Sequence, residues 1–316
     1  MSGNLITPGH MPDIRTGVLP EHAAMITALE ATGNYRVLQR FEARPHYAAP
    51  TPPTGVRRGL IVDVETTGLD TTNDRIIELG LVAFEFDSAG HVYGVHAMRD
   101  WFEDPGVPIP VEAVEITGIT DDMVRGQRID DAAVAAEIEA AHLVIAHNAN
   151  FDRRMLERRF PAFATKHWGC SLHDVPWSQF GCRGAKLDYL LFQLCSAFHT
   201  GHRAGDDCLA TLHVLATPRD GEATPLTRLL ERARRATVRL SAIGTPIETK
   251  ERLKARGYRW FNGSPARPKT WFRDLDEADV EAEQAWLREH AYGGLTNPPW
   301  QLERFTAKDR YSDRMT

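Results

Sequence analysis

The chain has 316 residues, of which 42% are apolar and 25% are charged, a composition that excludes a disordered or fibrous protein. No apolar run approaches the ~20 residues that a membrane span requires, and the first residues lack the basic and apolar regions of a secretion signal. We therefore expect a cytoplasmic protein without a membrane partner. The net charge of −6 alone argues against a nucleic-acid partner, but this charge is unevenly distributed.

Residues 1–58 are expected to form an N-terminal helix and a linker. The pattern predicts an amphipathic helix at 21–32, a short extended segment at 35–38 and a proline-rich linker at 48–55. We expect this region to pack on the surface of the main domain rather than to carry chemistry.

Residues 59–220 predict an α/β domain with a mixed sheet flanked by helices. Three strands joined by short connections predict an antiparallel start to the sheet, and a fourth strand that follows a helix is expected to run parallel to the first. The expected strands are 60–64, 75–86, 91–101 and 143–146. The expected helices are 108–115, a short helix capped by Asp121, 131–141, 153–160, 186–198 and 207–216.

Residues 221–316 predict a small α+β accessory domain. Between Thr224 and Arg273, thirteen Lys and Arg oppose three acids, a local balance of +10 that leaves −16 for the rest of the chain. This basic segment suggests a polyanion partner, and a solvated charged helix face is the alternative. The expected elements are a basic helix at 224–240 with Thr224 as its N-cap, a helix at 249–256, a hairpin of 257–261 and 270–273, and an acidic helix at 276–292.

The accessory domain also contains Tyr258, Trp260 and Trp271 among its basic residues. Aromatic rings interleaved with Arg and Lys can stack on single-stranded bases, or they can form the core of a small domain. We favour the core, and we keep as a hypothesis that this domain guides a strand into a catalytic cleft.

Two acids alternate on the first expected strand, in the run LIVDVETTGL. Because residues i and i+2 of a strand lie on one face of a sheet, the carboxylates of Asp63 and Glu65 are expected a few ångströms apart. Two like charges on a largely buried strand cost several kcal/mol unless a positive group joins them. An acid pair at a solvated strand end is the alternative, which further carboxylates reaching the same point would exclude.

Further candidates follow the strand at 143–146 and open the last helix of the domain. Asp152 comes just after that strand, at the end of an α/β sheet where ligands gather, although a helix N-cap is the other interpretation. His202 lies in a loop and Asp207 near the start of the next helix, so both side chains can point into one cleft.

Found once each and in this order, the segments VDVETTGLD, HNANFD and HRAGDD resemble the motifs of the DnaQ-like 3′–5′ exonucleases of the DEDDh branch. The resemblance covers about 59–216 and implies a ribonuclease-H-like fold. A bacterial subgroup of stand-alone members with an extra C-terminal domain is also similar to this chain in the segments YRVLQR, CSLHDVPW, KLDYLL, KERLKARGYRW and TAKDRYS.

The resemblance implies hydrolysis of phosphodiester bonds at a 3′ end, with release of 5′-monophosphates. Asp63, Glu65, Asp152 and Asp207 would hold two Mg²⁺ ions, for which Mn²⁺ should substitute, since four carboxylates match two hard cations in charge and ligand type. Two such ions ~4 Å apart lower the pKa of bound water and clamp the attacking and leaving oxygens. His202 would be the general base, and its unperturbed pKa of ~6.5 suits activity at neutral pH.

The resemblance also implies a slot for the last nucleotide of the substrate. Apolar residues in this slot could wedge beside a base or stack on it. The segment Thr117–Gly118–Ile119 stands where many relatives have His-Gly-Ile, so substrate contacts are expected to differ there. The residues expected to line the slot are Thr66, Thr67, Leu69, Ile119, Asn148 and Phe151.

The expected partner is a nucleic-acid 3′ end, with single-stranded DNA favoured over RNA. Because nothing in the motifs reads a 2′-hydroxyl, an RNA-trimming exoribonuclease or oligoribonuclease is an alternative. Two others are a polymerase-associated proofreading subunit and an inactive nucleic-acid-binding adaptor. All five family positions are filled, and the C-terminal part looks like a compact domain rather than a docking peptide, so we favour a free-standing enzyme.

Overall fold

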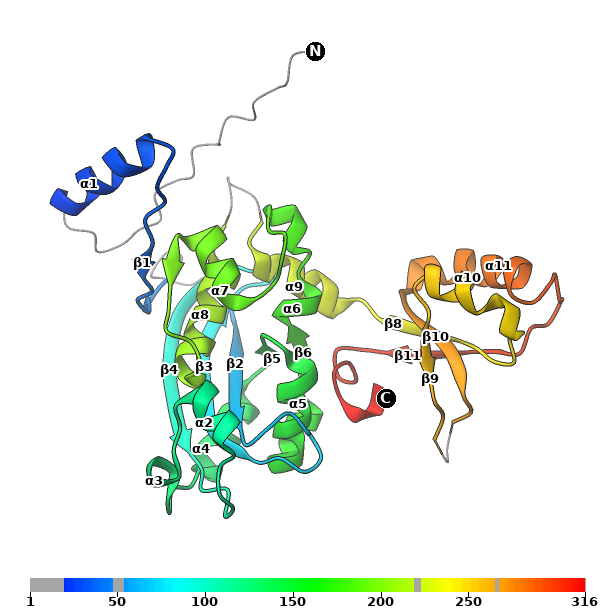
Figure 1. The fold of residues 1–316 in the computed structure, drawn as a ribbon, viewed down its shortest axis with the longest axis horizontal. Coiled ribbons are helices and arrows are strands. Elements are labelled where there is room, and N and C mark those ends of the chain that lie inside the picture. The colour runs from blue at the N-terminus through cyan, green and yellow to red at the C-terminus, as the bar shows by residue number, and fades with distance from the viewer. Residues whose placement is uncertain (1–19, 48–53, 219–222, 265–266, 316) are drawn as a thin grey trace, which may run out of the picture. The chain divides into compact units, whose positions relative to one another are not determined.

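The computed structural model describes residues 20–47, 54–218, 223–264 and 267–315 (Figure 1). Most of the predicted linker at 48–55 lies outside these ranges. The chain divides into two compact units, Met1–Arg232 and Ala233–Thr316. The second unit begins later than the expected residue 221, because helix α9 (Pro225–Arg234) contributes leucines to the core of the first unit. These are Leu226, Leu229 and Leu230.

A five-stranded mixed sheet forms the centre of the first unit, as predicted. In the spatial order β4-β3-β2-β5-β6, the first three strands are antiparallel, and β5 and β6 continue parallel to β2. β6 was not predicted, because its sequence HWGC lacks the continuous apolar run that marks the equally short β5. The bounds are β2 (Arg57–Thr66), β3 (Ile76–Phe86), β4 (Val92–Phe102), β5 (Leu143–Ala146) and β6 (His167–Cys170).

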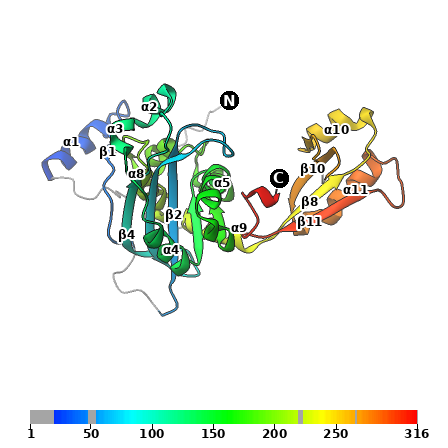
Figure 2. The ribbon, with the colours of Figure 1, turned by 90° about the horizontal axis from the view of Figure 1, so that it is seen from below.

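Helices cover both faces of this sheet (Figures 1 and 2). Helix α8 packs on β2, β3 and β4, whereas α5 packs on β2, β5 and β6. Within the described ranges, none of the helices combines the length and the apolar character needed for a transmembrane span. The α-helices before α9 are α1 (Pro20–Ala31), α2 (Val111–Thr117), α3 (Asp121–Val124), α4 (Asp131–Ala140), α5 (Ala149–Arg159), α6 (Ser171–Asp174), α7 (Leu187–Leu190) and α8 (Ala204–Ala216). The 3₁₀ and π helices are η1 (Pro161–Thr165), η2 (Trp177–Phe180) and the π-helix η3 (Leu191–Cys195).

Two glycines allow α8 to approach the sheet closely. A Cβ atom on Gly80 of β3 would lie 2.2 Å from the backbone carbon of Ala204, and one on Gly205 would lie 2.7 Å from the Cε atom of Met98. The backbone contact leaves no room for a Cβ atom at Gly80, and a Cβ atom at Gly205 would force the Met98 side chain to move. The first turn of α8 therefore rests directly on β3 and β4. This close contact positions Asp207, which belongs to that turn.

The helix predicted at 186–198 is confirmed as far as Cys195 and is wrong for its last three residues. After α7 and η3, Ser196 adopts a left-handed conformation with a φ of 49°, which ends the helix. The next two residues form β7 (Ala197–Phe198), which pairs in parallel with β1 (Gln39–Arg40). The N-terminal region therefore contacts the main domain through a strand, while the apolar side chains of α1 are largely exposed, Met25 to 64%.

The second unit is a four-stranded antiparallel sheet with two helices packed on it. The sheet order is β11-β8-β10-β9, and the predicted hairpin is confirmed as β9–β10. The strands are β8 (Thr237–Ala242), β9 (Arg259–Phe261), β10 (Thr270–Asp276) and β11 (Trp300–Phe305). The helices are α10 (Lys250–Ala255), α11 (Val280–His290) and the 3₁₀ turns η4 (Ile247–Thr249), η5 (Glu277–Asp279) and η6 (Asp313–Met315).

The basic helix predicted at 224–240 is wrong beyond Arg234. Residues 237–242 instead form β8, a central strand whose six residues are all buried and which pairs with both β10 and β11. This tertiary pairing outweighs the local helical pattern. Thr224 does cap α9 as predicted, since its Oγ1 atom accepts the N–H of Thr227 at 3.2 Å.

Acids that follow the basic segment 224–273 offset its positive charge. Arg239 and Arg259 both pair with Asp274, at 2.8 and 2.7 Å, and Arg273 pairs with Glu283 at 2.7 Å. Several arginines of the segment are therefore structural partners within the second unit, which weakens the argument for a basic surface.

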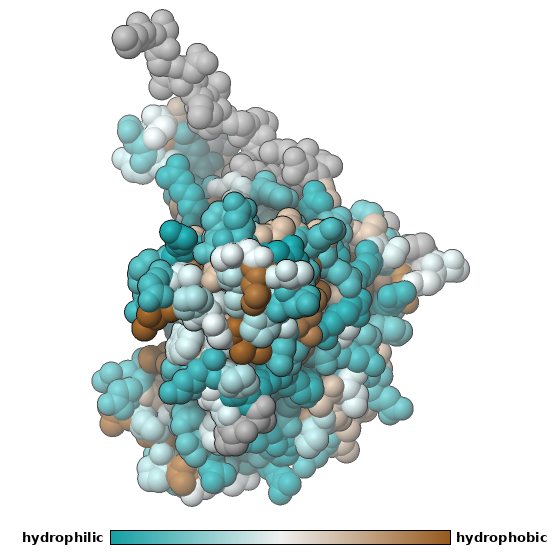
Figure 3. Space-filling view, turned by 90° about the vertical axis from the view of Figure 1, so that its right-hand side faces the viewer, coloured by the Kyte–Doolittle hydropathy of each residue, from teal (hydrophilic) through white to brown (hydrophobic). Residues whose placement is uncertain are grey.

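The aromatic residues of the second unit divide between core and surface. Tyr258 and Trp271 lie in the core, as favoured from the sequence, whereas Trp260 is 47% exposed beside Trp271. On the face of the molecule in Figure 3, hydrophobic side chains lie in small groups among hydrophilic ones. Such scattered exposure is common on protein surfaces, so it does not by itself mark a binding surface.

Candidate active site

Strand β2 places Asp63 and Glu65 on one face of the sheet. In the register with β3, Asp63 lies opposite Gly80 and Glu65 lies opposite Glu78. Since directly opposed residues of an antiparallel pair share a face, Glu78 joins the two predicted acids. Gly80 leaves the space above this row that α8 occupies.

Helix α5 brings Asp152 to the same strand. The helix has Asn148 as its N-cap, so Asp152 lies within the first turn and is not the cap. Its side chain is 3% exposed, and its Oδ1 atom accepts the N–H of Val64 at 3.2 Å. Because Val64 separates Asp63 from Glu65, this hydrogen bond fixes Asp152 beside both of them.

Asp207, in the first turn of α8, completes the acid cluster. One carboxylate oxygen each of Asp63, Glu65 and Asp207 lies within 4.8 Å of the other two, a spacing that could hold a metal ion. The Oδ2 atom of Asp207 accepts the backbone N–H of His202 at 3.0 Å. His202 itself is exposed and has a left-handed backbone with a φ of 59°. The structure thus brings the four predicted acids together and places the backbone of His202 against them.

An ion pair between the buried Glu78 and the partly exposed Arg203, unmarked by any sequence motif, borders the cluster. The carboxylate of Glu78 is fully buried. It accepts hydrogen bonds from Nε and Nη2 of Arg203 at 2.8 and 2.6 Å, and from the backbone N–H of Ala204 at 3.0 Å. Asp100 of β4 lies 3.8 Å from the same guanidinium. Arg203 therefore offsets part of the negative charge and ties the start of α8 to β3.

His199 also contacts the cluster, although the sequence predicted only a helix end there. Its side chain is 6% exposed, its Nδ1 atom lies 3.3 Å from Oδ1 of Asp207, and its Nε2 atom lies 2.8 Å from Oδ1 of Asp188 in α7. The two oxygens of Asp207 therefore face different groups, the imidazole of His199 and the backbone N–H of His202.

Burial raises the pKa of each clustered acid, and repulsion between the acids raises it further. The pKa of Glu65 rises to about 8 and that of Asp152 to about 7, and the pKa of Asp63 lies well above its usual range. Burial also raises the pKa of Asp207, and it raises the pKa of Asp100 to about 7. Without a cation, the folded cluster thus binds protons at neutral pH that the unfolded chain releases.

The comparison with protein families identifies the domain that carries this cluster. Residues 60–215 match a family model described as an exonuclease, RNase_T. These residues belong to the exonuclease family. The sequence resemblance to DnaQ-like exonucleases is thereby confirmed, and the matched range contains all five residues of the predicted site.

Curated relatives of the exonuclease domain include PolC-type DNA polymerases, which are much longer than this chain. The chain is 29% identical over 161 residues to the PolC-type DNA polymerase III of Clostridium perfringens, which covers 49% of this chain and 11% of the polymerase. It is 31% identical over 180 residues to the PolC-type enzyme of Halalkalibacterium halodurans, with 51% and 12% covered. The chain therefore spans about a tenth of the length of these relatives.

Two solved structures are also similar to the chain. Exonuclease X in complex with 5′ overhanging duplex DNA is 22% identical, covers 49% of this chain and 89% of its own, and has a TM-score of 0.37. The zinc-bound E. coli ExoI–ssDNA complex is 17% identical, covers 70% of this chain and 63% of its own, and has a TM-score of 0.48.

Internal hydrogen bonds hold the loop 66–75 of the exonuclease domain. The hydroxyl of Thr67 donates to Oδ1 of Asp74 at 2.9 Å, and the hydroxyl of Thr66 donates to a backbone carbonyl of the loop at 2.6 Å. Both threonine side chains are buried, whereas Leu69 is 86% exposed. Of the predicted slot residues in this loop, Leu69 is therefore the one that presents its side chain to solvent.

The other predicted slot residues differ in exposure. In the first turn of α5, Asn148 is exposed and Phe151 is half-buried. Ile119 is fully buried and packs with Ile77 and Val124, so it supports the helices α2 and α3 and offers no surface to a nucleotide.

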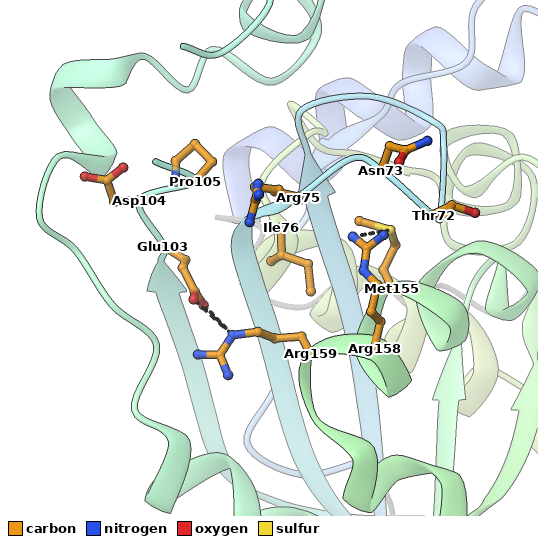
Figure 4. A pocket seen from close by; sticks show the side chains of 10 residues that line it. All are labelled: Thr72, Asn73, Arg75, Ile76, Glu103, Asp104, Pro105, Met155, Arg158 and Arg159. Atoms are coloured by element: carbon orange, nitrogen blue, oxygen red, sulfur yellow. Dashed lines mark hydrogen bonds and ion pairs between the residues drawn. The ribbon is translucent and has the colours of Figure 1, made fainter. Parts of the chain in front are cut away.

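A cavity of about 400 Å³ lies beside the loop, between β3, α5 and the segment after β4 (Figure 4). None of the clustered acids lines it. Arg158 of α5 donates to two backbone carbonyls of the loop 66–75, and Arg159 pairs with Glu103 at 2.9 Å. These arginines attach the loop and the end of β4 to α5, the helix that also carries Asp152.

The raised pKa values predict that the metal-free exonuclease domain loses stability as pH rises. A carboxyl whose pKa is higher in the folded state stabilises the fold at low pH, and this stabilisation is lost as pH rises through the folded pKa. The pKa of Asp152 in the folded state is about 7 and that of Glu65 is about 8, so the loss of stability from these two acids ends near those pH values. Burial lowers the pKa of His147 and His213 to about 4. These two histidines make the stability rise with pH, but only below about pH 6.5, the usual pKa of the unfolded histidine.

We therefore expect the melting temperature in EDTA to fall between about pH 6.5 and pH 8, where the acids dominate. Excess Mn²⁺ should remove most of this fall, because bound cations stabilise the ionised carboxylates in the folded state. The melting temperature is measured by thermal unfolding across this pH range, once with EDTA and once with Mn²⁺. A melting temperature in EDTA that stays level or rises over the interval would contradict the assembled cluster.

Proposed function

We propose that the chain is a metal-dependent 3′–5′ exonuclease that hydrolyses phosphodiester bonds from the 3′ end of DNA, single-stranded DNA in particular, and releases 5′-nucleoside monophosphates. One observation carries this proposal. Asp63 and Glu65 from β2, Asp152 from α5 and Asp207 from α8 meet in one cluster within a domain of the exonuclease family. An inactive adaptor would not need to retain every one of these acids.

The donor set fits hard divalent cations. Four carboxylates offer oxygen ligands only, and a bound cation would offset both the burial of their charges and the repulsion between them. We assign two Mg²⁺ ions to the site, with Mn²⁺ as a substitute. When bound, such ions activate water and stabilise the leaving oxygen of a phosphodiester. The residues that would hold them are Asp63, Glu65, Asp152 and Asp207.

His202 is the proposed general base. Its backbone N–H is anchored to Asp207, while its ring is exposed and can accept a proton from the attacking water. Leu69, Asn148 and Phe151 are the proposed contacts with the last nucleotide. Leu69 lies on the loop that follows β2, and Asn148 and Phe151 lie at the start of α5. Strand β2 and helix α5 carry three of the four acids.

Incubation of the full chain with 5′-labelled single-stranded DNA and RNA tests this function directly. With Mg²⁺ or Mn²⁺ we expect a ladder that shortens from the 3′ end of DNA, and with EDTA we expect intact strands. A ladder on RNA alone would replace this proposal with an exoribonuclease. Intact strands of both kinds with Mn²⁺ present would contradict the exonuclease assignment.

A proofreading role within a polymerase is the second candidate. It is favoured by the identity of 29% to 31% between this chain and PolC-type DNA polymerases over the exonuclease region. A proofreading exonuclease should remove a mismatched primer terminus faster than a paired one, because fewer base pairs must open. Rates on matched and mismatched duplex ends therefore separate the two candidates.

A further inference from the structure

Residues 36–47, which we name the N-terminal strap, precede the segment 60–215 that matches the exonuclease family. The strap begins at Arg36, whose side chain binds the π-helix η3. Its Nη2 atom donates to the carbonyl of Phe192 at 2.5 Å and to that of Gln193 at 3.2 Å, and its guanidinium lies 4.1 Å from the centre of the Phe192 ring. One side chain thus holds both the backbone and a ring of η3.

Backbone hydrogen bonds continue this attachment along β1 and β7. The N–H of Gln39 donates to the carbonyl of Ser196 at 3.0 Å, and the N–H of Phe41 donates to the carbonyl of Phe198 at 2.7 Å. Gln39 and Arg40 pair in parallel register with Ala197 and Phe198. The strap therefore supplies the strand partner of the segment that leads directly into His199.

The second half of the strap is attached to the body of the domain. The rings of Phe41 and Tyr47 lie 5.1 and 5.7 Å from the ring of His213, a buried residue of α8. The carbonyl of Pro45 accepts an N–H from β4 at 3.0 Å, and the N–H of Tyr47 donates to a carbonyl of β4 at 3.1 Å. The strap is thus fixed at one end to α8 and β4 and at the other to η3 and β7.

A single residue, His199, connects the strap and β7 to the acid cluster. His199 follows β7 immediately, is almost fully buried, and contacts Oδ1 of Asp207 with one nitrogen and Asp188 with the other. A displacement of β7 would move His199 and release one of the two groups that orient Asp207. The strap supplies the strand partner of β7, so it contributes to holding the segment that leads into His199.

We propose that the N-terminal strap positions Asp207 by holding β7 and His199, so that the segment 60–215 alone is not sufficient for full activity. His199 acts here as a positioning residue, because it touches a proposed metal ligand and no reacting atom. The proposal rests on the proposed exonuclease function. Partners of this kind behind a metal ligand typically contribute roughly 10–100-fold to metal affinity or activity.

The test uses full-length variants that leave the acids intact. Arg36→Ala should speed amide hydrogen exchange at 191–199, raise the Mn²⁺ concentration at the midpoint of the metal-induced rise in melting temperature, and lower kcat with little change in KM. His199→Ala should raise the midpoint and lower kcat by roughly 10–100-fold, and His199→Gln should recover part of both. Arg125→Ala, which removes an exposed arginine from a surface pair with Asp122, is the matched control.

Two results would overturn the proposal. The first is unchanged exchange at 191–199 in Arg36→Ala, which would show that the strap does not hold this segment. The second is faster exchange with an unchanged Mn²⁺ midpoint and unchanged kcat, which would make the strap a structural element only. A wild-type chain that releases no nucleotide would count against the proposed function instead, and the exchange and Mn²⁺ measurements would still decide the role of the strap.

Discussion

Replacement of Asp63 by Asn is expected to abolish nucleotide release while raising the melting temperature of the metal-free chain at pH 9. Asn has nearly the same shape but neither the charge nor the ligand strength of the carboxylate. Removal of one preorganised electrostatic group typically costs about 10²–10³-fold in rate, so turnover should fall by roughly 10³-fold. The loss should appear in kcat, because Asp63 would hold the cations that act on the reacting phosphate.

The rise in stability follows from the surroundings of the same side chain. Asp63 is buried among Asp152, Asp207 and Glu65, and all three raise its pKa. If Asp63 stays ionised on folding at pH 9, burial and repulsion of its charge cost free energy. If it takes up a proton instead, the uptake costs free energy at this pH, and Asn incurs neither cost. With saturating Mn²⁺ the order should reverse, because the wild type gains more from the metal.

Thermal unfolding with EDTA and with Mn²⁺, beside a single-turnover assay, makes this measurement. The control is Asp122→Asn, since Asp122 is an exposed acid whose removal should change neither quantity. If Asp63→Asn melts lower than the wild type in EDTA, burial of the Asp63 carboxylate and its repulsion by the other acids do not dominate the energy at this position.

Replacement of His202 by Ala is expected to lower turnover by roughly 10²–10⁴-fold while leaving KM and the Mn²⁺ midpoint nearly unchanged. The backbone N–H of residue 202, which contacts Asp207, is retained in this variant, so the metal ligands keep their positions. What is lost is the imidazole that we propose as the proton acceptor. The fall should be smaller at high pH, where hydroxide replaces the base.

The left-handed backbone at position 202 requires a second variant. With a φ of 59°, Ala is strained there, whereas Asn tolerates this conformation well. His202→Asn should therefore show the same loss of turnover without a loss of stability. His142→Ala, at an exposed position outside the cluster, is the control. Near-normal turnover in His202→Asn would remove the proposed role of the ring.

The acids that the sequence predicted are those whose positions follow from local periodicity. Asp63 and Glu65 share a face because strand residues alternate, and this alternation needs no knowledge of the tertiary structure. Asp152 follows the end of a strand, where the topology of an α/β sheet gathers ligands. The spacing of Asp207 and His202 along the chain suggested that they share one cleft. In the structure, the backbone N–H of His202 contacts the carboxylate of Asp207.

The residues that the sequence did not predict depend on contacts between distant segments. Glu78 and Asp100 lie in long strands outside any motif, and their place beside the cluster follows from the register of β2, β3 and β4. His199 followed a segment with a helical pattern, and it reaches Asp207 because the distant strand β1 pairs with β7. A local pattern contains no information on such pairings.

Strand β8 was misassigned for the same reason, and its position in the second unit has a consequence for synthesis of the chain. It pairs on one side with β10 and on the other with β11, both of which leave the ribosome after it. The strands of the first unit are complete by then, so that unit can fold while β8 still lacks both partners. A nascent chain at this stage exposes two open strand edges, and Arg239 in the middle of β8 is a charge of the kind that limits aggregation of such edges.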